Sequence, residues 1–205
     1  MSGTAGALSD TLRNAILRGD LPAGSQLRQD RLASELGVSK IPLREALQRL
    51  TAEGLATFDA NRGFSVSSLT AGEADEIYGL RIALEPLLLE RALPLLSIVD
   101  LAKAELALSE DEGAVPETNW HFHRALYAPA GWDRTLSVVR TLHTAVAPYL
   151  AVYLDDPGAA ESSARQHRQL LEHCRAGDRV SALGILVEHL SSARRFLVRA
   201  LSHGA

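Results

Sequence analysis

The stretch ASELGVSKIPLREALQRL, residues 33–50, decides the fold predicted for the first part of this chain. Gly37 suits the position just past a helix end, where a positive φ is favoured, and Ser39 can cap the helix that follows. Pro42 falls near the third helical position, where a missing N–H costs little. Four apolar residues then recur every three to four positions and form one face: Leu43, Ala46, Leu47 and Leu50. This pattern predicts a helix-turn-helix, whose second helix enters the DNA major groove.

The next segment separates this interpretation from its alternative, an ordinary helical hairpin with a solvated charged face. Leu55–Phe58 and Phe64–Ser67 flank the polar turn Asp59–Gly63, and the second run alternates apolar and polar residues. This arrangement predicts a β-hairpin. A helix-turn-helix followed by a hairpin is a winged helix. At the hairpin tip, Arg62 stands beside Gly63, so a cation lies next to a residue that allows close backbone approach to a phosphate or a minor groove.

Together these pieces resemble the N-terminal domain of GntR-type bacterial transcriptional regulators. The resemblance covers residues 8–69 and rests on four stretches in the family's order: Leu12–Leu27, Leu32–Leu50, Glu53–Leu55 and Arg62–Val66. It implies DNA binding, and we assign the contacts to Ser39, Lys40, Arg44, Gln48, Arg62 and Gly63. Two positions depart from the family pattern, Lys40 where Arg is usual and Ile41 where Thr is common. Lys keeps the charge but lacks the planar fork with which Arg reads guanine.

The composition is that of an ordinary globular protein, with 205 residues, 46% hydrophobic, 22% charged and a net charge of −4. No apolar run reaches the roughly 18 residues of a membrane span, and the N-terminus has no signal-peptide core. Cys174 is the only cysteine, so no intrachain disulfide is possible and a reducing cytoplasm is expected. Only the first 70 residues have a small excess of Lys and Arg. DNA binding should therefore depend on a few placed cations in two copies of the domain.

The predicted domains are a winged helix-turn-helix over residues 1–70 and an all-helical domain over residues 71–205, so the fold class is mostly α. Thr70, followed three positions later by Glu73, predicts a helix cap at the start of the second domain. Pro148 predicts a kink inside the fourth helix of that domain. Its six predicted helices span residues 73–92, 98–110, 116–128, 132–154, 160–176 and 179–202.

Three of the seven histidines lie on the apolar faces of three different predicted helices. His123 follows Asn119 by one turn, and His167 and His189 each belong to an apolar stripe. A buried imidazole needs a polar partner, and one shared metal would satisfy all three rings, with an oxygen as a fourth ligand. The alternative is three separate core histidines bonded to carbonyls, because periodicity alone cannot show that the three converge. We expect the remaining histidines on polar faces to lie at the surface: His121, His173 and His203.

The second half also resembles a known family, the FCD effector-binding domain of the FadR-type branch of GntR regulators, in its shorter VanR-like form with six helices. Three stretches carry the resemblance, together with His189: Ile77–Pro86, Asn119–Leu126 and Ala164–Asp178. Many members bind a divalent metal through Asp or Asn and three His. The resemblance therefore implies a metal of the Zn, Ni or Mn class held by Asn119, His123, His167 and His189.

Arg81 falls in an apolar helical stripe, where an unpaired cation is costly. One interpretation is a structural ion pair with Glu85. The other is an effector contact, in which Arg81 clamps the carboxylate of a small organic acid whose other end reaches the metal. The family's habit of binding such acids implies the second. His143 lies in a helix that is apolar nearly all round and is assigned to the same effector pocket.

We therefore expect a cytoplasmic, homodimeric transcriptional repressor that binds a palindromic double-stranded DNA operator and responds to a small carboxylate. No membrane contact and no enzymatic activity are expected. A metalloenzyme using the three histidines, with the first domain for targeting, is one alternative, but no Asp or Glu stands beside these histidines at the spacing of a general base. An architectural DNA-binding protein is the other, and it leaves the inward histidines and Arg81 unexplained.

Overall fold

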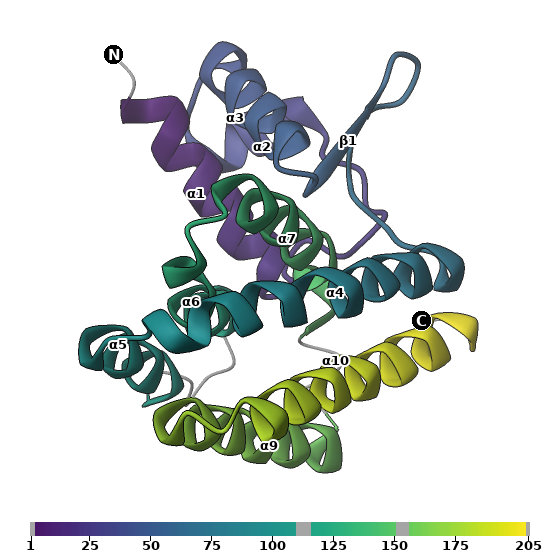
Figure 1. Cartoon of the computed structure of the whole chain (residues 1–205). Helices are drawn as coiled ribbons and strands as arrows, with labels where there is room; N and C mark the ends of the chain where they lie inside the picture. The colour runs from purple at the N-terminus through teal and green to yellow at the C-terminus, as the bar shows by residue number, and fades with distance from the viewer. Residues whose placement is uncertain (1–2, 110–115, 151–155, 204–205) are drawn as a thin grey trace. The chain divides into compact units, whose positions relative to one another are not determined.

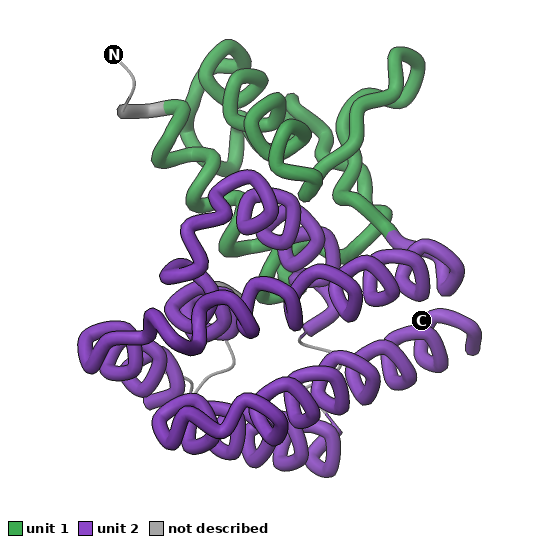
Figure 2. The backbone as a smooth tube through the Cα atoms, viewed as in Figure 1, with its two compact units in different colours: residues 1–68 green, residues 69–205 purple. Residues whose placement is uncertain are grey.

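The computed structural model describes residues 3–109, 116–150 and 156–203. Figure 2 shows that the chain forms two compact units, residues 1–68 and residues 69–205. Within the described ranges, no helix has both the length and the apolar character needed to cross a membrane.

The first unit contains three helices and a β-hairpin (Figure 1). The helices are α1 (Gly3–Leu17), α2 (Gln29–Leu36) and α3 (Lys40–Ala52). The hairpin pairs β1 (Ala56–Asp59) with β2 (Gly63–Val66) in antiparallel register, so that Ala56 lies opposite Val66. This order of elements confirms the predicted winged helix-turn-helix.

In the turn between α2 and α3, the backbone conformation is as predicted, but the predicted side-chain cap is absent. Gly37 adopts φ 65° and donates its N–H to the Ser34 carbonyl, and the N–H of Val38 donates to the Ala33 carbonyl, which ends α2. Ser39 occupies the N-cap position of α3 with an extended backbone, but its side chain makes no capping hydrogen bond. The predicted side-chain cap is therefore wrong. A capping hydroxyl bonds the N–H of the second or third helical residue, and the third residue here is Pro42, which has no N–H.

The apolar face of α3 forms the centre of the first core. Its four apolar residues are completely buried: Leu43, Ala46, Leu47 and Leu50. Helix α1 packs along α3 with its own buried Leu12 and Ile16. Arg13 donates two hydrogen bonds to the Glu53 carboxylate, at 2.9 and 2.7 Å, and so ties α1 to the end of α3. Because one face of α3 is fixed in this way, its opposite face is left exposed.

In the described part of the second unit, every regular element is a helix. Helix α4 begins at a capping box, in which the Thr70 hydroxyl accepts from the Glu73 N–H at 3.2 Å and the Glu73 carboxylate accepts from the Thr70 N–H at 2.8 Å. This confirms the predicted cap. The helices are α4 (Ala71–Ala92), α5 (Ile98–Ser109), α6 (Pro116–Tyr127), α7 (Asp133–Val146), α9 (Pro157–Ala176) and α10 (Arg179–Ser202).

Helix α7 is shorter than predicted. It ends at Val146, and Ala147–Tyr149 form a 3-10 turn that contains Pro148. The predicted helix is therefore not continuous at Pro148: the missing N–H and the bulk of the ring replace α-helical bonding by a 3-10 turn, after which Leu150 is again helical. The rest of that predicted helix, residues 151–154, and residue 110 of an earlier one lie outside the described residues.

Three helices of the second unit send side chains into one shared core. Helix α10 packs along both α4 and α9, and α6 packs against α4 and α5 (Figure 1). Phe122 of α6, Leu170 of α9 and Leu186 of α10 are at most 1% exposed and belong to the same cluster. Polar residues on the inward faces of these helices are therefore brought close together.

Candidate nucleic-acid interface and metal centre

The exposed face of α3 carries most of the residues assigned to DNA. Arg44 and Gln48 are exposed on the side opposite the buried leucines. Lys40, in the first turn of α3, is also exposed and forms an ion pair with Asp30 of α2. An exposed pair of this kind is weak, so it does not prevent Lys40 from meeting a phosphate.

A cleft separates α3 from the hairpin. It is lined by Arg44, Gln48, Thr51, Phe58 and Phe64. The Arg44 guanidinium carbon lies 6.0 Å from the centre of the Phe58 ring, within cation–π range, and Phe58 and Phe64 pack with ring centres 4.8 Å apart. Half of Phe58 is exposed, so this aromatic residue, which the sequence analysis did not single out, borders the same face as Arg44.

The hairpin turn presents the other two assigned residues. Asp59 accepts hydrogen bonds from the backbone N–H groups of Asn61 and Arg62 at 2.7 and 2.9 Å, and these bonds hold the pKa of its carboxyl below the ordinary value. Arg62 is exposed and Gly63 adopts φ 80°, a left-handed conformation that favours glycine. The contact of each assigned residue with DNA stays a prediction.

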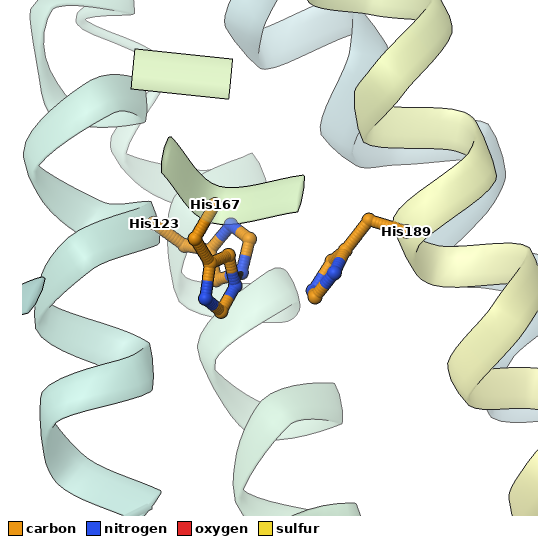
Figure 3. Close-up of side chains that lie close together, drawn as sticks. All are labelled: His123, His167 and His189. Carbon is orange, nitrogen blue, oxygen red and sulfur yellow. Dashed lines mark hydrogen bonds between the residues drawn. The ribbon is translucent and has the colours of Figure 1, made fainter. Parts of the chain in front are cut away.

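In the second unit the structure brings three predicted metal ligands together (Figure 3). His123 of α6, His167 of α9 and His189 of α10 are 0%, 4% and 6% exposed. One ring nitrogen of each lies within 4.8 Å of those of the other two. Figure 3 shows His123 and His167 next to each other, with the ring of His189 facing them from α10. The three histidines therefore converge, which the periodicity of the sequence alone could not show.

The spacing of these nitrogens suits a small divalent ion. The Nε2 atoms of His123 and His167 are 3.3 Å apart. Two nitrogens bound tetrahedrally to zinc, each at roughly 2.0–2.1 Å, would be about 3.3 Å apart. Asn119, the predicted fourth ligand, is half-buried one turn before His123 on α6, and its role as a ligand stays a prediction.

Beside the histidines lies a buried ion pair. Arg81 is 3% exposed and donates from Nε to Glu85 Oε1 at 2.6 Å, so the structural pairing considered for Arg81 is present. The Nε2 atom of His143 lies 2.8 Å from Arg81 Nη2 and 3.1 Å from Glu85 Oε1. The ring of His143 is 5.3 Å from that of His123, centre to centre. Arg81 and His143 thus lie beside the candidate metal site, as the effector assignment requires.

Burial sets the charge of these groups. It lowers the pKa of His123 and His167 well below the ordinary value, and neighbouring imidazoles add to the effect. Burial also lowers the pKa of His189, to about 4. Burial opposes the charge of Glu85, but Arg81 and His143 together hold the pKa of its carboxyl well below the ordinary value. The three histidines are therefore neutral near pH 7, which is the form that binds metals.

Three buried residues at this site were missed as functional candidates. Glu85 was considered only as a partner for Arg81. Tyr127 donates its hydroxyl to Glu85 Oε2 at 2.8 Å and lies 3.0 Å from Nδ1 of His123, and its spacing of one helical turn from His123 was the available signal. Gln166 Oε1 is 3.2 Å from Nδ1 of His189, a contact between α9 and α10 that no sequence spacing indicates.

The chain matches two known protein families. Residues 4–66 match the bacterial regulatory proteins of the gntR family, and residues 76–192 match the FCD domain. It is 27% identical to YdhC of Bacillus subtilis, an HTH-type transcriptional regulator, over 94% of this chain and 90% of that protein. It is 29% identical to the transcriptional repressor GlaR of Escherichia coli, over 87% and 89%.

Solved structures are similar to this chain as well. A GntR family member from Pseudomonas syringae is 32% identical, with a TM-score of 0.59 over 97% of this chain and 86% of that one. McbR/YncC of Escherichia coli is 24% identical, with a TM-score of 0.78 over 98% and 99%, and shows the same fold. The matching families and the names of the relatives indicate transcriptional regulators, not enzymes. The chain therefore belongs to the GntR family of bacterial regulatory proteins and carries an FCD domain after its winged helix.

Proposed function

We propose that the protein is a cytoplasmic, homodimeric repressor whose affinity for a palindromic operator changes when a small carboxylate binds near a divalent metal. The observation that carries this proposal is a group of three buried histidines from α6, α9 and α10, with one ring nitrogen of each within 4.8 Å of the other two, in a chain that also has a winged helix with exposed cations. Relatives named as repressors, GlaR among them, support the direction of regulation.

In this proposal His123, His167 and His189 hold the metal, with Asn119 as a fourth ligand. The bound ion supplies a Lewis-acidic position for a carboxylate oxygen. Arg81 and His143 lie beside this site and would bind the effector. Because Glu85 already neutralises Arg81, an effector carboxylate at the guanidinium has to compete with Glu85.

On the DNA side, Arg44 and Gln48 read the major groove, Ser39 and Lys40 meet the backbone or base edges, and Arg62 with Gly63 makes the wing contact. Two copies of the winged helix would bind the two half-sites, so that dimer symmetry matches operator symmetry. By linkage, an effector that weakens operator binding by some factor is itself bound more weakly on the operator by the same factor.

The variant Arg44→Ala tests the DNA assignment. Loss of this exposed cation from α3 should weaken binding to the operator about 5- to 150-fold, because one bidentate contact to a base is worth roughly 1–3 kcal/mol. Arg134→Ala is the matched control, since it removes the same charge from an exposed position in the second unit. Fluorescence anisotropy with labelled operator gives both affinities, and circular dichroism checks that helical content is unchanged. Wild-type affinity in a folded Arg44→Ala protein would contradict the assignment.

A screen of small carboxylates against the same wild-type complex tests the effector. The proposal expects at least one acid to change operator affinity, and Arg81→Lys to lose that response while still binding the operator. Lys retains the charge but not the planar fork that grips a carboxylate. An Arg81→Lys protein that responds like the wild type would show that Arg81 does not bind the effector.

A further inference from the structure

A chain of hydrogen bonds leads from α4 to the candidate metal ligand on α6. Glu85, Tyr127 and His123 are all 0% exposed. The Tyr127 hydroxyl lies 2.8 Å from Glu85 Oε2 and 3.0 Å from His123 Nδ1. Because these side chains are fully buried, each of their polar atoms is expected to have a hydrogen-bond partner.

The carboxylate of Glu85, at the end of this series of hydrogen bonds, fixes the direction of each bond. Glu85 forms a buried ion pair with the Arg81 guanidinium, which keeps its carboxyl ionised, so Glu85 can only accept hydrogen bonds. The Tyr127 proton must therefore point to Glu85. Its oxygen can then only accept from His123, which places the His123 proton on Nδ1. The lone pair of His123 is left on Nε2, the atom that lies 3.3 Å from Nε2 of His167.

His189 is oriented in the same way by a different residue. Gln166 is 7% exposed, and its Oε1 lies 3.2 Å from His189 Nδ1. An amide oxygen has no proton to donate, so Nδ1 of His189 carries the proton and its Nε2 carries the lone pair. Two of the three histidines thus have their Nδ1 atoms held by buried acceptors on neighbouring side chains.

We propose that Tyr127, held by Glu85, and Gln166 are positioning residues that fix His123 and His189 as Nδ1–H tautomers and leave Nε2 of each ring as the metal-binding atom. This inference rests on the proposed metal function and adds the residues that prepare the site before the ion arrives. Outer partners of this kind hold the ring and its tautomer in place, and their loss typically weakens metal binding about 10- to 100-fold.

The test uses Tyr127→Phe, which removes one hydroxyl and keeps the ring, in the full-length chain. Tyr149→Phe is the matched control, because Tyr149 is also buried and its hydroxyl accepts from the backbone N–H of Leu69, away from the histidines. Gln166→Leu tests the second partner independently. Each protein is freed of metal, and nitrogen-15 NMR of the imidazoles then reports which ring nitrogen carries the proton. Competition with a chelator gives the dissociation constant for Zn²⁺.

We expect the wild type and Tyr149→Phe to show His123 and His189 as Nδ1–H tautomers and to bind Zn²⁺ with equal affinity. Tyr127→Phe should convert His123 to a mixture of tautomers and bind Zn²⁺ about 10- to 100-fold more weakly, and Gln166→Leu should do the same through His189. Unchanged tautomers and unchanged Zn²⁺ affinity in folded variants would overturn the proposal. If Tyr127→Phe does not fold, Gln166→Leu decides.

Failure of the metal function gives a different result. A wild-type protein that does not bind Zn²⁺, Ni²⁺ or Mn²⁺ contradicts the proposed metal site, whatever the tautomers are. The NMR spectra of the metal-free proteins then still decide whether Tyr127 and Gln166 orient the two rings.

Discussion

Glu85 is the residue on which the buried polar side chains of the second unit depend. It accepts from Arg81 and Tyr127, and it lies 3.1 Å from His143 Nε2. Removing an ion from water costs several kcal/mol, and this cost is offset here because the two charges meet at 2.6 Å and further hydrogen bonds satisfy the carboxylate. The cation in the apolar stripe of α4 is tolerated because Glu85 lies one turn away.

His143 makes the stability of the metal-free protein depend on pH. Burial, with the nearby charge of Arg81, lowers the pKa of its ring in the folded state, although Glu85 acts in the opposite direction. As pH falls below the ordinary histidine value near 6.5, the unfolded chain takes up the proton first, so stability declines until the folded pKa is reached. The contribution of this one ring is at most roughly 1.4 kcal/mol per pH unit.

Urea unfolding between pH 7.5 and 5, with chelator present, measures this effect. The slope of unfolding free energy against pH should be smaller in His143→Gln than in the wild type, whereas His121→Gln, at an exposed position, should keep the wild-type slope. Equal slopes in all three proteins would mean that His143 gains its proton as easily in the folded state as in the unfolded one.

At the residue scale, much of the candidate metal site could be predicted and its surroundings could not. Helical periodicity shows which face a histidine occupies, so the inward orientation of His123, His167 and His189 was predictable. Their convergence needed the packing of α6, α9 and α10, which periodicity does not give. Gln166 was not predictable, because its partner lies on a different helix and 23 residues away.

At the element scale, the two predicted helix caps differ in a way that stability measurements can detect. The Thr70 hydroxyl accepts from the Glu73 N–H, whereas the Ser39 hydroxyl makes no capping bond. Thr70→Ala should therefore lower the free energy of unfolding by about 1 kcal/mol, a usual cost for a lost N-cap. Ser39→Ala should change it by less than about 0.5 kcal/mol, as for an ordinary surface substitution.

Urea unfolding of the two variants beside the wild type makes this comparison. Equal losses from Thr70→Ala and Ser39→Ala would show that the Ser39 side chain does cap α3 in solution. Operator affinity is measured on the same samples, because Ser39 is also assigned to DNA and its substitution should weaken binding without lowering stability.

Helix positions were predicted well because their signals are local. Gly37 and Gly177 end α2 and α9 with positive φ, and Thr70 opens the capping box of α4. The errors arose where two local rules compete. At Ser39 the preference for a capping side chain meets Pro42, which lacks one of the two backbone N–H groups that a capping hydroxyl could bond. At Pro148 a helical pattern continues on both sides, and only the structure shows that α7 ends before it.

At the scale of the whole molecule, the chain joins a winged helix to an FCD domain, and each unit has its own core. In the proposed function, operator recognition belongs to the first unit and ligand recognition to the second. Residues that face the operator can then be changed without altering the buried histidines, and the reverse also holds. Arg44→Ala and Tyr127→Phe should accordingly affect operator affinity and metal affinity separately, since the first residue is exposed on α3 and the second is fully buried in α6.

The metal content of the purified protein tests the central claim most directly. Untagged wild type, purified without chelator, is compared by mass spectrometry with His167→Ala, and with His121→Ala as a control from an exposed position on the same helix as His123. The account predicts about one transition-metal ion per chain in the wild type and the control, and loss of that ion in His167→Ala. A wild type without metal, or a His167→Ala protein that retains it, would contradict the account.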